Sequence, residues 1–149
     1  MKSDRTLVLM ADDAEARFLL NEGPGTGLRE LAGMKVSQFA DADLDYEDRP
    51  GRQTGGPGNM ARHGFDPHDT VEEQRRGRFV THVVKALDQE WRQVKPDRLV
   101  VAAPPKMLGV LRKALGGAPA AALAGDLAKD LMKIPAIDLP KHFEGLIKL

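Results

Sequence analysis

Cysteine is absent from this chain of 149 residues. The sequence therefore excludes disulfide bonds and thiolate metal sites, and nothing in it indicates an oxidising compartment. Serine is almost as scarce, because only Ser3 and Ser37 occur, and neither lies in the glycine-flanked pattern of a nucleophile elbow. The sequence thus offers no serine, histidine and aspartate arrangement for nucleophilic catalysis.

Long hydrophobic runs are also missing. The longest stretch without a charge, residues 114–125, is rich in alanine and glycine and falls short of the roughly 20 apolar residues that cross a bilayer. The apolar residues 7–11 are followed at once by Asp12 and Asp13, so they are too few for the core of a signal peptide. We therefore expect a cytoplasmic protein with no membrane partner.

The chain has no net charge, because 22 basic side chains balance 22 acidic ones. Binding to nucleic acid by bulk attraction is not expected, since that requires a positive excess. The balance is uneven, however: residues 1–50 carry 11 acids and 6 bases, whereas residues 100–149 carry 4 acids and 7 bases. A local basic patch is compatible with this distribution.

The patterns that are present indicate a single α/β domain spanning residues 1–149. The short continuous apolar run Thr6–Ala11 is typical of a strand buried on both faces. Residues 14–20 alternate well enough to return as its antiparallel partner, and the glycine-rich residues 21–27 lead to a third strand over residues 28–36. The domain is thus predicted to begin with an antiparallel hairpin in a mixed sheet.

Residues 37–69 show no periodicity and contain five glycines and three prolines. A structureless segment of this length is uncommon in a compact domain, and it is usually either functional or disordered. We expect a long, flexible, Gly-rich loop here.

A long helix is predicted over residues 70–94. Thr70 and Glu73 have the spacing of a capping box at its start. Pro96 ends it and disfavours helical geometry at the residue before. Apolar residues recur between these limits at helical spacing and form one stripe, namely Val80, Val83, Val84, Leu87, Trp91 and Val94.

The second half of the chain continues the alternation of helix and strand. Residues 99–103 are a second buried strand, which the intervening helix makes parallel to the first. Pro104 and Pro105 open another helix, which ends before Gly116-Gly117. Residues 119–127 are compatible with helix or edge strand, and a final helix is predicted over residues 138–147, with Asp138 as its cap.

The loop contains the cluster His63, Asp66 and His68. Imidazole beside carboxylate is the pairing used for general acid–base catalysis, because histidine titrates near neutral pH. One hypothesis is therefore a hydrolase site formed by these three residues, and the alternative is a set of solvated loop side chains. Their spacing matches no standard metal motif, so we predict neither a metal nor a cofactor.

Basic side chains recur on one side of the predicted long helix, opposite the apolar stripe. As a functional surface this is a candidate ridge for RNA phosphates, and the alternative is the solvated side of an amphipathic helix. The residues concerned are Arg75, Arg78, His82, Lys85 and Arg92. Lys106 is a further candidate, because it follows the strand 99–103 at a usual ligand position in open α/β sheets.

Several segments together resemble the bacterial host attachment protein family. They are the opening hairpin, residues 66–69 leading into residues 72–79, the stretch RLVVAAPPKMLGVLRKAL over residues 98–115, and residues 129–135. This resemblance spans nearly the whole chain. It implies a mixed sheet flanked by helices, with a strand over residues 119–127.

That family is distantly similar to the middle domain of eukaryotic and archaeal class-1 release factors, whose Gly-Gly-Gln loop enters the peptidyl-transferase centre. Here the matching triplet is Gly55-Gly56-Pro57. Proline lacks both the amide side chain of glutamine and its backbone N–H, so hydrolysis of peptidyl-tRNA is not expected. Gly55, Gly56 and Asn59 are candidates for contact with RNA or a partner.

Three hypotheses follow. The first is a non-catalytic protein, associated with the ribosome or with structured RNA, that uses the loop and the basic helix face. The second is a hydrolase acting on a phosphate-bearing or RNA substrate through the loop histidines. The third is a protein-interaction module, with an indirect effect on host attachment, whose loop folds on a partner.

Overall fold

The computed structural model describes residues 4–43 and 70–146, and these residues build a five-stranded mixed sheet of order β3-β2-β1-β4-β5. β1 pairs antiparallel with β2 and parallel with β4; β2–β3 is antiparallel and β4–β5 parallel. The α/β fold with a mixed sheet and a hairpin start is confirmed. The strands are β1 (Thr6–Ala11), β2 (Glu15–Asn21), β3 (Arg29–Lys35), β4 (Arg98–Ala102) and β5 (Leu123–Leu127).

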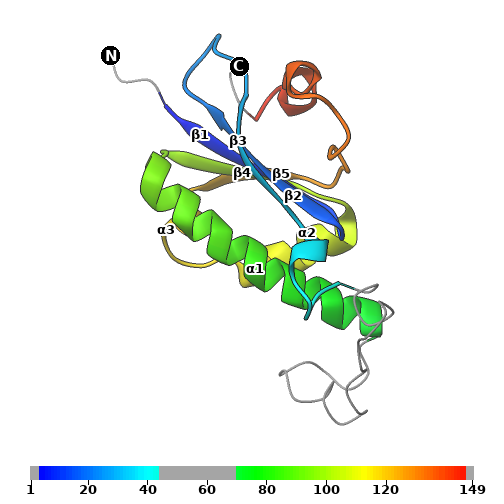
Figure 1. Ribbon diagram of the computed structural model, residues 1–149. Coiled ribbons are helices and arrows are strands. Elements are labelled where there is room, and N and C mark those ends of the chain that lie inside the picture. Colours follow the sequence, from blue (N-terminus) through cyan, green and yellow to red (C-terminus); the bar gives the residue numbers. More distant parts are fainter. Residues whose placement is uncertain (1–3, 44–69, 147–149) are drawn as a thin grey trace.

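Helices connect and cover these strands. The α-helices are α1 (Val71–Val94), α2 (Pro105–Ala114) and α3 (Gly117–Ala121). Short 3-10 segments follow β3 and β5, namely η1 (Val36–Gln38), η4 (Ala136–Asp138) and η5 (Pro140–Phe143). Figure 1 shows α1 on one side of the sheet and the C-terminal segment, coloured orange to red, on the other side.

The central strands β1 and β4 are buried on both faces, and side chains alternate between these faces along each strand. Leu7 and Leu9 of β1 face α1 and α2 in one hydrophobic cluster, which includes Phe79 and Leu111. Val8 and Met10 face the opposite way and pack with Leu131, Leu139 and Phe143 in a second cluster. Burial on both faces accounts for the continuous apolar run that predicted the first strand.

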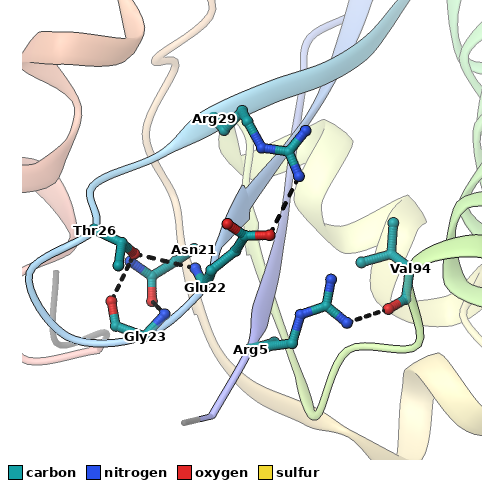
Figure 2. Close-up of polar contacts among 7 residues, drawn as sticks. All are labelled: Arg5, Asn21, Glu22, Gly23, Thr26, Arg29 and Val94. Atoms are coloured by element: carbon teal, nitrogen blue, oxygen red, sulfur yellow. Dashed lines mark hydrogen bonds and ion pairs between the residues drawn. The ribbon is translucent and has the colours of Figure 1, made fainter.

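Defined contacts hold both ends of α1. The Thr70 hydroxyl accepts a hydrogen bond from the Glu73 backbone N–H at 3.1 Å, as the capping pattern predicted. At the other end the chain leaves the helix through Lys95 in a left-handed conformation (φ 51°), and Arg5 donates to the Val94 carbonyl. Figure 2 shows this contact, which ties the C-terminus of α1 to the residue that precedes β1.

The connection between β2 and β3 is fixed by Asn21 and Thr26 (Figure 2). The Thr26 hydroxyl donates to the Gly23 carbonyl at 2.7 Å, and the Gly23 N–H donates to Asn21 Oδ1 at 3.2 Å. Gly25 and Gly27 have positive φ angles of 81° and 70°, which side chains disfavour. The backbone geometry of this turn therefore requires the glycines from which the turn was predicted.

Three expectations need correction. Residues 37–43, assigned to the loop, instead form part of η1 and a hydrogen-bonded turn in which Ala42 is buried. Residues 119–127 divide between α3 and β5, so helix propensity and family resemblance were each partly right. The helix predicted over residues 138–147 is wrong, because residues 136–143 form only two 3-10 segments and Gly145 then takes a φ of 88°.

The ion pair between Arg112 of α2 and Asp126 of β5 gives a testable pH dependence. The hydrogen bond from Arg112, with distances of 2.7 and 2.8 Å, lowers the pKa of the Asp126 carboxyl. The folded state then binds the proton more weakly than the unfolded state, so this stabilisation exists above the ordinary carboxyl pKa and is lost as the pH falls through the lowered value. Asp126→Asn should lower the free energy of unfolding by less than about 1 kcal/mol at neutral pH.

Urea unfolding at neutral pH and at about pH 3 measures this difference. The difference in the free energy of unfolding between the wild type and Asp126→Asn should be smaller at the acidic pH. A gap that stays constant would show that the loss arises from packing and not from the charge.

Candidate functional site

Two of the predicted basic residues of α1 turn inward. Arg75 is 5% exposed, and its Nη1 donates to the carbonyls of Asp43 at 3.0 Å and Ala40 at 3.4 Å. Arg78 is 9% exposed and donates to the Asp41 carbonyl at 3.2 Å. These guanidinium groups fasten the turn after η1 onto the first half of α1, so they do not belong to an exposed ridge.

His82 continues this set of contacts one turn further along α1. Its Nε2 lies 2.8 Å from Asp41 Oδ1, and its ring stacks on Phe39 with centroids 4.0 Å apart. Phe39 in turn lies 6.3 Å from Phe79 in the core. His82 is therefore engaged in holding residues 39–41 and is only partly accessible.

The remaining candidates on α1, Lys85 and Arg92, are exposed. They border a surface hollow of about 290 Å³ between α1 and α3, which Trp91 and Pro119 also line. Sequence reasoning assigned Trp91 to the core alone. The structure places it at the boundary, since it packs against the core cluster but remains partly exposed.

A larger pocket, of about 580 Å³, opens at the carboxyl ends of the neighbouring parallel strands β1 and β4. We call it the carboxyl-edge pocket. Its lining comes from the β1–β2 turn, from α1 and from the start of α2, namely Asp12, Asp13, Ala14, Arg76, Pro104, Pro105, Lys106 and Met107. Lys106 thus lines a pocket at the carboxyl edge of the sheet, where its place after the second buried strand put it.

The charged side chains around this pocket differ in the hydrogen-bond and ion-pair partners that they have. Arg76 forms a two-point ion pair with Asp13, with distances of 2.8 and 2.9 Å, and this hydrogen bonding raises the pKa of the guanidinium. Asp12 Oδ1 accepts hydrogen bonds from the N–H groups of Ala14 and Glu15. Lys106 is exposed and, among residues 4–43 and 70–146, has no ion pair.

The start of α2 adds a partial positive charge to the pocket. No side chain caps this helix, and its first turn contains no acidic residue. Pro104 and Pro105 lack N–H groups, but Lys106 and Met107 have backbone donors within the first turn that no intrahelical carbonyl can satisfy. The pocket can therefore offer an anion one ammonium group and two backbone donors.

A smaller recess of about 260 Å³ adjoins the carboxyl-edge pocket, because Asp13, Ala14 and Arg76 line both. Its other wall includes Asp43 and Glu72. These residues flank the interval from 44 to 69 on either side. The described chain on both sides of that interval is thus anchored beside the carboxyl-edge pocket.

Part of the predicted site lies outside the described residues. This applies to the proposed acid–base cluster His63, Asp66 and His68, and equally to the predicted contact residues Gly55, Gly56 and Asn59. Sequence reasoning also missed Asp12, Asp13 and Arg76 as pocket residues. The available signal was the pair of acids directly after a buried strand, which the sequence analysis used only to exclude a signal peptide.

Within the ranges 4–43 and 70–146, no three or more histidine, aspartate or glutamate side chains are grouped so that they could hold a metal ion. In the same part of the chain, no helix is both long enough and apolar enough to cross a membrane.

The fold and the pocket define an α/β protein with a mixed five-stranded sheet and a ligand-sized opening at the carboxyl ends of two parallel strands. The chain belongs to the family described as "protein required for attachment to host cells", which matches residues 7–143. The family resemblance inferred from the sequence is therefore confirmed. No curated protein sequence matches the chain significantly.

Solved structures with a similar fold include the type II variant of the Aquifex aeolicus Ppx/GppA phosphatase. It is 12% identical with a TM-score of 0.43, and the match covers 83% of this chain and 35% of that one. A second structure, of the PPX-GPPA enzyme from the same organism, is 10% identical with a TM-score of 0.44 and the same coverage. The chain spans about a third of the length of these structures.

Proposed function

We propose that this chain is a non-catalytic, RNA-associated protein that accepts an RNA phosphate in the carboxyl-edge pocket. The observation that carries the proposal is the exposed Lys106 ammonium in a pocket of about 580 Å³, without an ion pair among the described residues. Pockets that hold small ligands have volumes of about 300–1,000 Å³, so a phosphate with its sugar can enter.

The chemistry around Lys106 favours phosphate over other groups. A lysine ammonium binds phosphate as a point charge, and free N–H groups at the start of a helix add directed donors. Lys106 and Met107 supply both from adjacent positions. The ligand is thus expected to be anionic and to present several acceptor oxygens.

The two acidic side chains of the pocket weaken this attraction less than their formal charges imply. Asp13 is neutralised by its ion pair with Arg76, and two backbone N–H groups partly offset the charge of Asp12. The pocket as a whole is close to neutral, as is the chain. Binding is therefore expected to be local and moderate, without the bulk attraction of a strongly basic protein.

The chain on either side of residues 44–69 lies near the carboxyl-edge pocket. Asp43 and Glu72 lie beside the pocket, so a bound RNA would pass next to the chain on both sides of that interval. We propose that Gly55, Gly56 and Asn59 contact RNA from there. The exposed cations Lys85 and Arg92 of α1 would offer RNA a second place of contact.

Charge reversal at Lys106 tests the proposal. Lys106→Glu should weaken binding of a labelled single-stranded RNA roughly tenfold, since a hydrogen bond to a charged group contributes about 1.5 kcal/mol. The slope of log affinity against log salt should fall by about 0.7 for each lost phosphate contact. Fluorescence anisotropy at several salt concentrations measures both quantities.

Lys141→Glu is the matched control, because Lys141 is exposed on the segment that covers the opposite face of the sheet. Equal affinities for the Lys106→Glu and Lys141→Glu proteins would contradict the proposal. RNA cleavage that His68→Ala abolishes would replace it with the hydrolase hypothesis. Salt-insensitive association with a protein, without RNA, would support the interaction module instead.

A further inference from the structure

We infer that the hollow between α1 and α3 is a stacking subsite for one nucleotide of single-stranded RNA. We call it the Trp91 hollow. This inference rests on the proposed RNA association and deepens it, since it names a second contact and the form of RNA it recognises. Four of its lining residues carry the argument: Lys85, Trp91 and Arg92 from α1, and Pro119 from α3.

The Trp91 hollow contains an aromatic ring. Trp91 lies in the last turn of α1, where its own carbonyl accepts the N–H of Lys95 as the helix ends. One side of the residue packs against the core cluster, and the rest remains partly exposed in the hollow. An indole that packs against the core and also lines a surface hollow offers a rigid, partly accessible aromatic surface on which a base can stack.

The size of the Trp91 hollow limits what it can hold. The Trp91 hollow has a volume of about 290 Å³, at the lower end of the range of roughly 300–1,000 Å³ for small-ligand sites. Pro119 is the buried residue of α3 and gives the hollow a second apolar wall. A single base with part of its sugar suits this volume, whereas a helical or strand segment of a protein partner would need a longer groove.

Charged side chains border the Trp91 hollow. Lys85 and Arg92 are seven residues apart in one helix, so they lie on the same side, about 10 Å apart along the axis. Neither has an ion pair among the residues that the structure describes. Asp88 lies between them and also lines the hollow, which leaves the three side chains with one net positive charge. That charge matches one phosphodiester group.

The combination favours a nucleotide over other anions. Two cations alone would suit any phosphate or carboxylate, but a partly exposed indole in the same hollow adds stacking that only a flat ring can use. Asp88 and Gln89 also border the hollow and offer an acceptor and a donor to base edges. Single-stranded RNA supplies an unpaired base and a phosphate together.

The Trp91 hollow is separate from the carboxyl-edge pocket. Arg76 lines the pocket, whereas the residues of α1 that line the hollow begin at Lys85 and end at Arg92. By helical rise these positions are about 14–24 Å further along the axis. The two sites can therefore be tested independently, with different substitutions.

Trp91 is the only tryptophan in the chain, so its fluorescence reports on the hollow directly. We would titrate the full chain with a short oligoadenylate and follow the Trp91 emission, while anisotropy of a labelled copy follows total binding. Stacking should quench the emission with the same midpoint as the anisotropy change. Lys85→Gln with Arg92→Gln should move that midpoint to a roughly tenfold higher RNA concentration.

Lys133→Gln with Lys141→Gln removes the same charge from the segment on the opposite face of the sheet, and it should leave the midpoint unchanged. Trp91→Leu, which keeps an apolar contact with the core but no flat ring, should weaken RNA binding roughly tenfold. Trp91→Phe, which keeps a flat ring, should weaken it less. Circular dichroism would verify that both variants are folded.

The outcomes separate the two proposals. RNA binding without quenching, or equal effects of the two double variants, would overturn the Trp91 hollow and leave the carboxyl-edge pocket standing. Quenching that survives Lys106→Glu, with weaker total binding, would support both sites. Absence of any RNA binding would overturn both proposals together.

Discussion

Arg75→Ala should lower the free energy of unfolding by about 2–3 kcal/mol, the scale of losing buried hydrogen bonds from a charged group. The Arg75 guanidinium donates to the carbonyls of Ala40 and Asp43, and the residue is almost fully buried. Its removal leaves those acceptors without this donor and loosens the turn after η1 from α1. Urea unfolding followed by circular dichroism measures the loss.

Two companion variants identify the cause of that loss. Arg75→Met keeps the apolar stem and removes the donors, so it should be nearly as destabilising as alanine if hydrogen bonds dominate. Lys85→Ala, on the exposed side of the same helix, should change stability by less than about 0.5 kcal/mol. An Arg75→Ala protein as stable as the wild type would show that the turn does not depend on this contact.

Phe143→Ala should be still more costly, at about 3–5 kcal/mol, which is typical of truncating a buried phenylalanine. Phe143 is fully buried in η5 and packs in the second core cluster with Leu131 and Leu139. The substitution should weaken the whole C-terminal segment against the sheet. Urea unfolding gives the energy, and hydrogen exchange over residues 131–146 shows where protection is lost.

Ile137 provides a matched control within the same segment, because it is 86% exposed. Ile137→Ala should change stability by less than about 0.5 kcal/mol. If the two alanine variants were equally stable, the C-terminal segment would contribute little to the fold, and the second cluster would need a different account.

Much of the fold follows from local patterns. The continuous apolar runs in β1 and β4 predicted buried strands, and the Thr70–Glu73 spacing with the apolar stripe predicted α1. The C-terminal segment was harder, because Leu139 and Phe143 have helical spacing but reach the sheet from 3-10 turns. Its conformation is decided by what the sheet face can accommodate, which local sequence does not encode.

The basic face of α1 shows a second limit of sequence reasoning. Helical geometry placed Arg75 and Arg78 opposite the apolar stripe, but opposite to the stripe is not the same as exposed. Residues 40–43 cover that side of the helix, through contacts with residues more than 30 positions away in sequence. Periodicity along the helix cannot reveal such long-range packing. The buried Arg75 and Arg78 and the exposed Lys85 and Arg92 therefore follow the same pattern in the sequence.

The position of Lys106 could be predicted, but its pocket could not. A residue after a buried parallel strand is expected at the carboxyl edge of the sheet. The opposing wall requires the β1–β2 turn to meet the start of α2, and it requires Arg76 to reach Asp13 across the sheet edge. These contacts depend on the strand order, which the sequence constrains only weakly.

The most direct test of the central claim is an amide chemical-shift titration of the isotope-labelled chain with a short single-stranded RNA. The account predicts that shifts concentrate at Asp12–Ala14, Arg76 and Lys106–Met107, with a second group at residues 85–92. It also predicts that Lys106→Glu suppresses the first group. Shifts confined to the C-terminal segment, or none as RNA is raised well above the protein concentration, would contradict it.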